Sequence, residues 1–308
     1  LWAFVFELAG MVFLPARDAS IPDLVDGDDD LATANGLVLG TSYGMIPVGA
    51  GFFALVTALA GGAGGVDVAR FVFAVDALTF AVSFVAIARL PELGISSPVG
   101  DGGGGGRFVD ALRLPIVRRL APVAAVVAFG LGALFSLGIV WVREVLGASD
   151  TQFGLLVACF GVGAGVGVLV LRRLPGHDLR TVTTALVLQG GVIATMSLAP
   201  TIGFALLGAV GFGGLTAVVL ALAMQLLQDE VGDRDRVLAF AVFHMVIRGG
   251  LAVAAIGAGV ADDLLDEVTW PLVGHLASSQ VVLLSSGLLV VLVGALAGRP
   301  GGAADSQR

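Results

Sequence analysis

Apolar runs long enough to cross a lipid bilayer are the dominant feature of the sequence. A helix of about 20 apolar residues spans the ~30 Å hydrocarbon core of a membrane. Runs close to this length lie at Val38–Ala60, Phe71–Leu90, Val123–Val142, Phe153–Leu171, Val182–Ala199, Ile202–Leu227, Val237–Val260 and Ala277–Ala297. We interpret the shorter run Leu1–Leu14 as the end of a helix that begins upstream of Leu1. The sequence therefore predicts an all-α polytopic membrane protein with nine transmembrane helices.

The composition supports this fold class and excludes several kinds of site and partner. Hydrophobic residues make up 57% of the chain and charged residues only 13%, whereas an average soluble domain has about 25% charged residues. The 16 basic residues are all arginines spread over loops, so no patch for nucleic acid is predicted. The single cysteine, Cys159, excludes an intramolecular disulfide, and the histidines lack metal-ligand spacing. We therefore expect neither a metal nor a cofactor.

One long interruption divides the apolar runs, at residues 91–120. Its consecutive glycines, Gly102–Gly106, cannot hold a packed element. After them, apolar residues recur every four positions among arginines, namely Phe108, Leu112, Ile116 and Leu120 with Arg107, Arg113, Arg118 and Arg119. This pattern predicts an amphipathic basic helix on the membrane surface, restarted at Pro115. The linker separates residues 1–90 from a C-terminal bundle at 121–298, which a tail at 299–308 follows.

The arginines predict the orientation of the chain in the membrane. If the predicted spans alternate in direction, all of the 16 arginines except Arg70, Arg143 and Arg248 fall on one side. Cytoplasmic loops carry an excess of basic residues, so this side is predicted to be the cytoplasm. We therefore expect a multi-pass protein of the cell membrane (inner or plasma membrane), with the linker and the C-terminal tail in the cytoplasm.

The position of the linker suggests a chain built from two bundles. Three predicted spans precede it and six follow it, and many transporters consist of two equivalent halves. Arg17–Gly51 and Asp229–Gly259 support an internal repeat, because each is a charged loop followed by a glycine-rich span. We expect three further helices upstream of Leu1, which would complete a set of twelve.

Four stretches resemble the major facilitator superfamily of transporters. Pro15–Leu37 is similar to the loop between its fourth and fifth helices, and Val75–Ile87 to its sixth helix. Val142–Gly167 resembles the connection of helices seven and eight, and Gly232–Gly250 that of ten and eleven. Their order resembles the branch of drug/proton antiporters and siderophore exporters of the enterobactin-exporter type, with the chain covering helices four to twelve. The resemblance implies a monomeric secondary transporter that exports small organic molecules in exchange for protons by alternating access.

Ionisable residues inside predicted spans are the candidates for substrate binding or proton coupling. Glu7 lies about 12–14 Å from the cytoplasmic end of its helix, near the midplane, and helix four faces the central cavity in the family. Arg248 lies about 16 Å into the helix that begins near Val237, and His244 precedes it by one turn. Such residues are costly at this depth and mark functional sites by default. The other interpretation of Arg248 is a packing arginine bonded to backbone carbonyls.

The segment predicted as the fifth helix supplies further candidates. Asn35 and Tyr43 are candidates to line the cavity, and Tyr43 could equally lie at a helix contact. The candidate gating or packing motif of this segment consists of Gly44, Pro47, Gly49 and Gly51. Pro47 and Gly51 are the positions that match the antiporter motif of the family. A proline within a span frees a backbone carbonyl, so it acts either as a hinge or as a static bend.

Glycines at four-residue spacing predict close helix packing. Gly161 with Gly165 and Gly163 with Gly167 form two such rows in one span. Small residues at this spacing let two helix backbones approach closely inside a membrane. Static packing and a role in a moving gate are the two interpretations of these rows.

No enzyme is predicted, because the zinc motif HExxH and the phosphate loop GxxxxGK[ST] are both missing from the sequence. A lipid-modifying enzyme would need a cluster of polar residues at a membrane surface, and the acidic loop lacks His or Lys partners. The alternatives to an exporter are an uptake transporter of the same facilitator type and a truncated remnant that does not transport.

Overall fold

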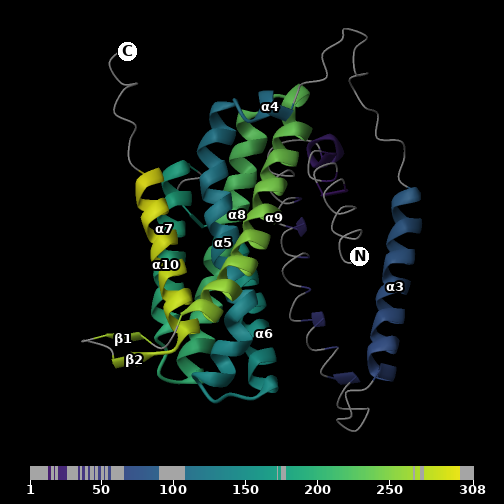
Figure 1. Ribbon diagram of the computed structural model, residues 1–308. Coiled ribbons are helices and arrows are strands. Elements are labelled where there is room, and N and C mark those ends of the chain that lie inside the picture. Colours follow the sequence, from purple (N-terminus) through teal and green to yellow (C-terminus); the bar gives the residue numbers. More distant parts are fainter. Residues whose placement is uncertain are drawn as a thin grey trace, which may run out of the picture.

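The computed structural model describes residues 66–89, 108–171, 178–265, 268–270 and 274–298, with 173–174 and isolated positions between 13 and 56, among them a short 3-10 helix η1 (Ile21–Leu24) (Figure 1). In this part of the chain, seven helices are long and apolar enough to cross a membrane. They are α3 (Val66–Ala88), α5 (Pro115–Glu144), α6 (Asp150–Leu171), α7 (Leu179–Ser197), α8 (Ile202–Glu230), α9 (Asp233–Leu264) and α10 (Ser278–Ala297).

Each of these helices coincides with one of the predicted apolar runs. The prediction of a helical membrane protein is therefore confirmed for the described residues. The two other predicted spans lie largely outside them. Only the last positions of Leu1–Leu14 and scattered positions of Val38–Ala60 are described, all of them helical.

Local sequence signals fix where several helices begin. Pro115 occupies the first turn of α5, where its missing N–H is not needed. Asp178 caps α7, because its carboxylate accepts hydrogen bonds from the hydroxyl of Thr181 at 2.6 Å and from the backbone N–H of Thr181 at 2.9 Å. These bonds hold the pKa of Asp178 below its usual value. The hydroxyl of Thr201 accepts from the N–H of Phe204 in the same way at the start of α8.

The basic amphipathic segment of the linker lies partly inside the bundle. The short helix α4 covers only Phe108–Ala111, and the helix restarts at Pro115 as the first turns of α5. Ile116 and Leu120 are buried in the core of the bundle, whereas the arginines between them are exposed. Ile116 and Leu120 therefore pack against other helices, whereas Leu112 is exposed, and the bundle begins before residue 121.

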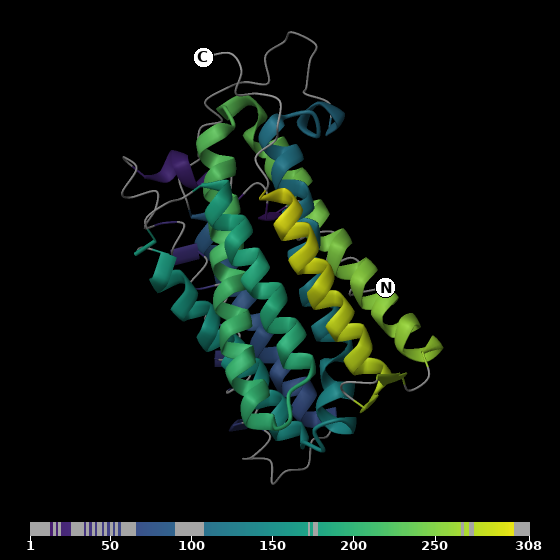
Figure 2. The ribbon, with the colours of Figure 1, turned by 90° about the vertical axis from the view of Figure 1, so that its left-hand side faces the viewer.

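Helices α5 to α10 form a six-helix bundle with a regular pairing (Figures 1 and 2). α5 packs along α9 and α6 along α8, and both helices of each pair run in the same direction. α7 packs along α10 in the opposite direction, and α7 contacts α8 as α10 contacts α5. The first three helices correspond to the last three, α5 to α8, α6 to α9 and α7 to α10. Under this correspondence the α5–α9 contact becomes the α8–α6 contact, and the α7–α8 contact becomes the α10–α5 contact. The bundle therefore consists of two three-helix units of opposite direction, related by an approximate two-fold axis.

The contact between α7 and α10 lies on this axis. A Cβ atom added to Gly190 would lie 2.7 Å from the carbonyl oxygen of Gly287, and one added to Gly287 would lie 2.8 Å from that of Gly190. The same Cβ of Gly190 would lie 2.7 Å from the backbone nitrogen of Val291, and that of Gly287 2.6 Å from the nitrogen of Ala194. Such reciprocity is what a two-fold contact requires.

Helix α3 has a different environment from the bundle helices. No part of its span is buried, and large apolar side chains such as Phe73, Leu78 and Phe84 are exposed. Figure 1 shows α3 apart from the six-helix bundle. An apolar helix without a polar face suits contact with lipid or with other membrane helices.

A short hairpin joins α9 to α10. Its strands are β1 (Val268–Trp270) and β2 (Gly274–Leu276), which pair antiparallel with Thr269 opposite His275. Figure 1 shows the hairpin projecting beside the bundle. Within the described residues it is the one departure from the predicted all-α architecture.

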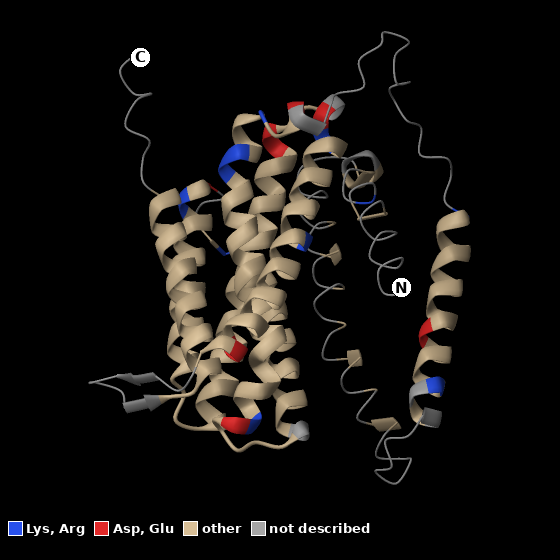
Figure 3. Cartoon of the chain, in the orientation of Figure 1, with Lys and Arg blue, Asp and Glu red and all other residues tan. Residues whose placement is uncertain are grey.

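Charged residues of the bundle gather at the helix ends (Figure 3). The arginines at one end include Arg118, Arg119, Arg180 and Arg236, from the N-terminal turns of α5, α7 and α9. At the opposite end of α5 lies Arg143. Among the described residues, this asymmetry follows the one-sided arginine distribution that the sequence predicts.

Candidate functional site

Several of the predicted site residues lie outside the described part of the chain. These are Glu7, Asn35, Tyr43, Gly44, Pro47 and Gly51. Gly49 is described, and it is exposed and helical, with no heavy atom within 4 Å of an added Cβ. The geometry of a site can therefore be built on the C-terminal bundle, which carries the remaining candidates Arg248 and His244.

Arg248 is the charge that lies deepest in the bundle. It is half-buried near the middle of α9. Every other described charge on α5 to α10 lies in the first or last two turns of its helix. A charge at this depth is retained only where it is paired, hydrated or able to reach a cavity. The helix begins four residues earlier than the predicted start near Val237, and a functional role of Arg248 stays a prediction.

His244 lies one helical turn before Arg248, so both side chains project from the same side of α9. The imidazole is buried, and its ring meets the ring of Phe243 edge-on, with the centroids 6.2 Å apart. α9 thus presents a cation and a second group that can carry a proton within one turn.

The contact with α5 fixes the position of this part of α9. A Cβ on Gly132 of α5 would lie 2.6 Å from the carbonyl oxygen of Leu251 and 2.8 Å from the Cβ of Ala254. The hydroxyl of Ser136 donates a hydrogen bond of 3.1 Å to the carbonyl oxygen of Ala255. The two backbones therefore touch at Leu251, three residues after Arg248.

Three phenylalanines form a line across the bundle. The ring of Phe135 on α5 meets Phe160 on α6 edge-on at 6.0 Å, and Phe160 meets Phe212 on α8 at 5.5 Å. Phe160 and Phe212 are buried, whereas Phe135 is exposed. Sequence reasoning missed this line, because nothing in the spacing of the three residues distinguishes them from the other phenylalanines of the chain.

A buried polar pair links α7 and α8. The side-chain amide of Gln189 donates a hydrogen bond of 2.7 Å to the hydroxyl of Thr216, which donates in turn to the carbonyl oxygen of Phe212 at 2.7 Å. Both side chains are fully buried, and the side-chain oxygen of Gln189 has no hydrogen-bond partner. Sequence reasoning missed this pair as well, although a glutamine within an apolar run is the signal that would have drawn attention to it.

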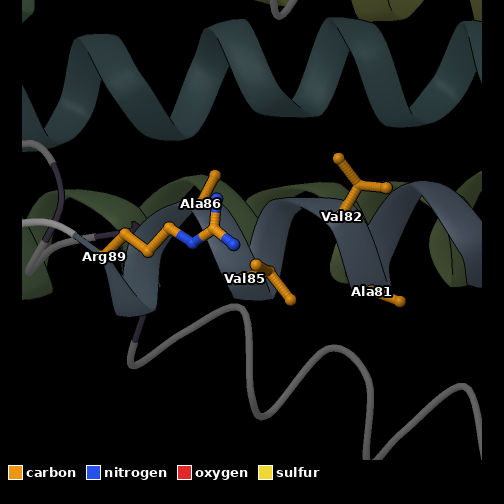
Figure 4. Close-up of a pocket in the computed structure, with 5 residues that line it drawn as sticks. All are labelled: Ala81, Val82, Val85, Ala86 and Arg89. Atoms are coloured by element: carbon orange, nitrogen blue, oxygen red, sulfur yellow. The ribbon is translucent and has the colours of Figure 1, made fainter.

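A hollow of about 360 Å³ lies beside α3 (Figure 4). The described residues that line it are Ala81, Val82, Val85 and Ala86 of α3 and Arg89, which directly follows the helix. Figure 4 shows the guanidinium of Arg89 running back along the helix. Since a single helix and the residue after it supply all of these side chains, the described residues form an open surface and not an enclosed site.

The described residues contain no group of three or more His, Cys, Asp or Glu that could hold a metal ion. Of the predicted site residues, the described bundle therefore carries Arg248 and His244, both on α9. No known family model matches the sequence, and no curated protein matches it either.

Proposed function

We propose that the protein is a secondary transporter of the major facilitator type, which exports small organic molecules across the cell membrane in exchange for protons. The observation that carries the proposal is the internal symmetry of the C-terminal bundle. Its three-helix units run in opposite directions and meet on an approximate two-fold axis at Gly190 and Gly287. Repeats of inverted topology are a recurring construction of secondary transporters, in which substrate sites lie at the repeat interface near the bilayer midplane.

The position of Arg248 agrees with this proposal. A half-buried cation near the middle of α9 is at the depth where such transporters bind their substrates. In the proposed cycle, Arg248 binds either an acidic group of the substrate or the carboxylate of Glu7. His244 and Glu7 are the groups that exchange protons, because imidazole and carboxyl side chains both change charge when they do so.

The test is transport by the full-length protein in liposomes that enclose a pH-sensitive dye. We expect an imposed proton gradient to drive movement of a small organic substrate, with protons moving in the opposite direction. Arg248→Ala and Glu7→Gln are expected to lower the flux by about tenfold or more, which corresponds to about 1.4 kcal/mol of lost interaction. Arg143→Ala is the matched control, because this exposed arginine lies at the end of α5.

Two results would count against the proposal. Wild-type flux in both Arg248→Ala and Glu7→Gln would remove these residues from the mechanism. A full-length protein that moves neither protons nor any of a panel of organic acids, bases and neutral drugs would remove the transport function itself.

A further inference from the structure

We propose that the hollow beside α3 binds an anionic phospholipid, with the headgroup phosphate on Arg89 and an acyl chain along the helix. The inference goes beyond the proposed transport, because it requires only that α3 lies in a membrane. The site combines a hollow of about 360 Å³, an apolar lining and a guanidinium at its end.

The hollow runs along one side of α3. Its apolar lining residues, Ala81, Val82, Val85 and Ala86, are separated by steps of one and four positions, so they form a stripe along the helix. The two alanines leave space that larger side chains would fill. Phe84 projects from the adjoining side of the helix and is 73% exposed. The sequence of α3 therefore places a row of small side chains beside a bulky one.

The length and position of the hollow fit one leaflet of a bilayer. The apolar span of α3 is Arg70–Ala88, which has 19 residues and is about 28 Å long. Ala81 precedes Arg89 by eight residues, or about 12 Å. Half of the hydrocarbon core is about 15 Å thick. The hollow therefore extends from the end of the span to near the midplane, as an acyl chain does below its headgroup.

Arg89 points in an unusual direction for an arginine at the end of a membrane helix. Such side chains ordinarily extend away from the hydrocarbon toward the headgroups. Figure 4 shows the guanidinium directed back along α3, to the level of Ala86. With the described residues, the guanidinium forms neither a hydrogen bond nor an ion pair. A charge in apolar surroundings is costly unless it is paired, so an anion is favoured at this position.

The lining of the hollow selects the kind of anion. A guanidinium matches a phosphate group and can donate two parallel hydrogen bonds to it. The other lining side chains are apolar and suit a hydrocarbon chain. A phospholipid carries both groups in one molecule. An anionic lipid is favoured over a zwitterionic one, whose own cation repels Arg89, and anionic lipids are concentrated on the cytoplasmic side, where the sequence predicts this end of α3.

The test counts lipids bound to the full-length protein in detergent by native mass spectrometry. Dioleoylphosphatidylglycerol is the anionic probe, and dioleoylphosphatidylcholine has the same chains with a zwitterionic headgroup. We expect the protein to bind the anionic lipid about fivefold more tightly. Arg89→Gln is expected to remove this preference. Arg173→Gln is the matched control, because Arg173 is also an exposed arginine, and it should keep the preference.

A second pair of variants tests the hollow itself. Ala86→Phe places a large side chain in the hollow and is expected to weaken binding of the anionic lipid by about fivefold. Ala88→Phe adds the same ring two positions later, about 200° around the helix, and should leave binding unchanged. Both alanines are exposed, so neither substitution disturbs a packed core.

Several results would overturn the proposed site. Equal binding of the two lipids by the unmodified protein would show that no headgroup is selected. An equal loss in Arg89→Gln and Arg173→Gln would show a general attraction to positive charge. Displacement of the lipid by excess inorganic phosphate would show an anion site without a lipid chain, and unchanged binding in Ala86→Phe would show that another helix covers the hollow. None of these results bears on the proposed transport.

Discussion

A single amide at the centre of the bundle is poorly matched to its surroundings. Gln189 is fully buried, donates to Thr216 and has an oxygen atom without a hydrogen-bond partner. Burial of an unpaired polar atom costs free energy, and removing the one partner that remains increases this cost. The contributions of Gln189 and Thr216 to the stability of the bundle are therefore coupled and not additive.

This coupling leads to a prediction for thermal unfolding in detergent. Thr216→Val removes the acceptor of the Gln189 amide, and we expect a loss of about 1–3 kcal/mol of stability. Adding Gln189→Leu to the same protein removes the unpaired amide and is expected to recover most of that loss. Thr195→Val is the control, because Thr195 is exposed on the same helix and bonds only within its own turn. Additive losses in the double variant would contradict the coupling.

At the scale of the element, the length of an apolar run was enough to locate each described membrane helix. It was not enough to say which side of a helix packs. The two glycine rows of α6, Gly161 with Gly165 and Gly163 with Gly167, have the same four-residue spacing. The sequence pattern therefore predicts close packing equally for both. In the structure, Gly163 and Gly167 face the backbone of α8, whereas a Cβ on Gly165 would meet no heavy atom within 4 Å. The choice depends on where α8 lies, which spacing within α6 does not encode.

The two rows provide a matched pair of substitutions. A Cβ on Gly163 would overlap the carbonyl oxygen of Val210, so we expect Gly163→Ala to force α6 and α8 apart and to cost about 1–3 kcal/mol of stability. Gly165→Ala meets open space and is expected to be neutral or slightly stabilising, since alanine restricts the unfolded chain. Thermal unfolding of both variants in detergent measures the difference. Equal melting temperatures would show that Gly163 does not close this helix contact.

The start of α5 shows a second limit of sequence patterns. An apolar residue at every fourth position predicts a one-sided helix, but the pattern is the same for a helix on a lipid surface and for one that packs on other helices. Ile116 and Leu120 satisfy the pattern by packing in the core. The amphipathic character could be predicted, and its partner could not.

At the scale of the whole molecule, the pairing of helices was beyond the sequence. Which helices touch depends on contacts between residues far apart in the chain, and only a weak internal repeat hinted at two related halves. The candidate site was predicted in part. Helical spacing placed His244 and Arg248 on one side of α9, but the aromatic line from Phe135 depends on three helices and left no trace in the spacing of any one of them.

The orientation in the membrane can be tested with single cysteines in a Cys159→Ser background. Ser149→Cys lies in the exposed turn between α5 and α6, and Gly232→Cys in the exposed turn between α8 and α9. Because the arginine-rich end is predicted to face the cytoplasm, a membrane-impermeant maleimide should label only Ser149→Cys in intact cells. Gly232→Cys should react after the cells are permeabilised. The reverse pattern would invert the predicted topology.

Helix contacts closed by backbone atoms have a mechanical consequence. A contact made by long side chains can absorb a push through a change of rotamer, but at Gly190, Gly287 and Gly132 there is no rotamer to change. We therefore expect a displacement of one helix to displace its neighbours by a similar amount. The six helices are then expected to move together, with a large change of shape at the boundary of this bundle and not within it.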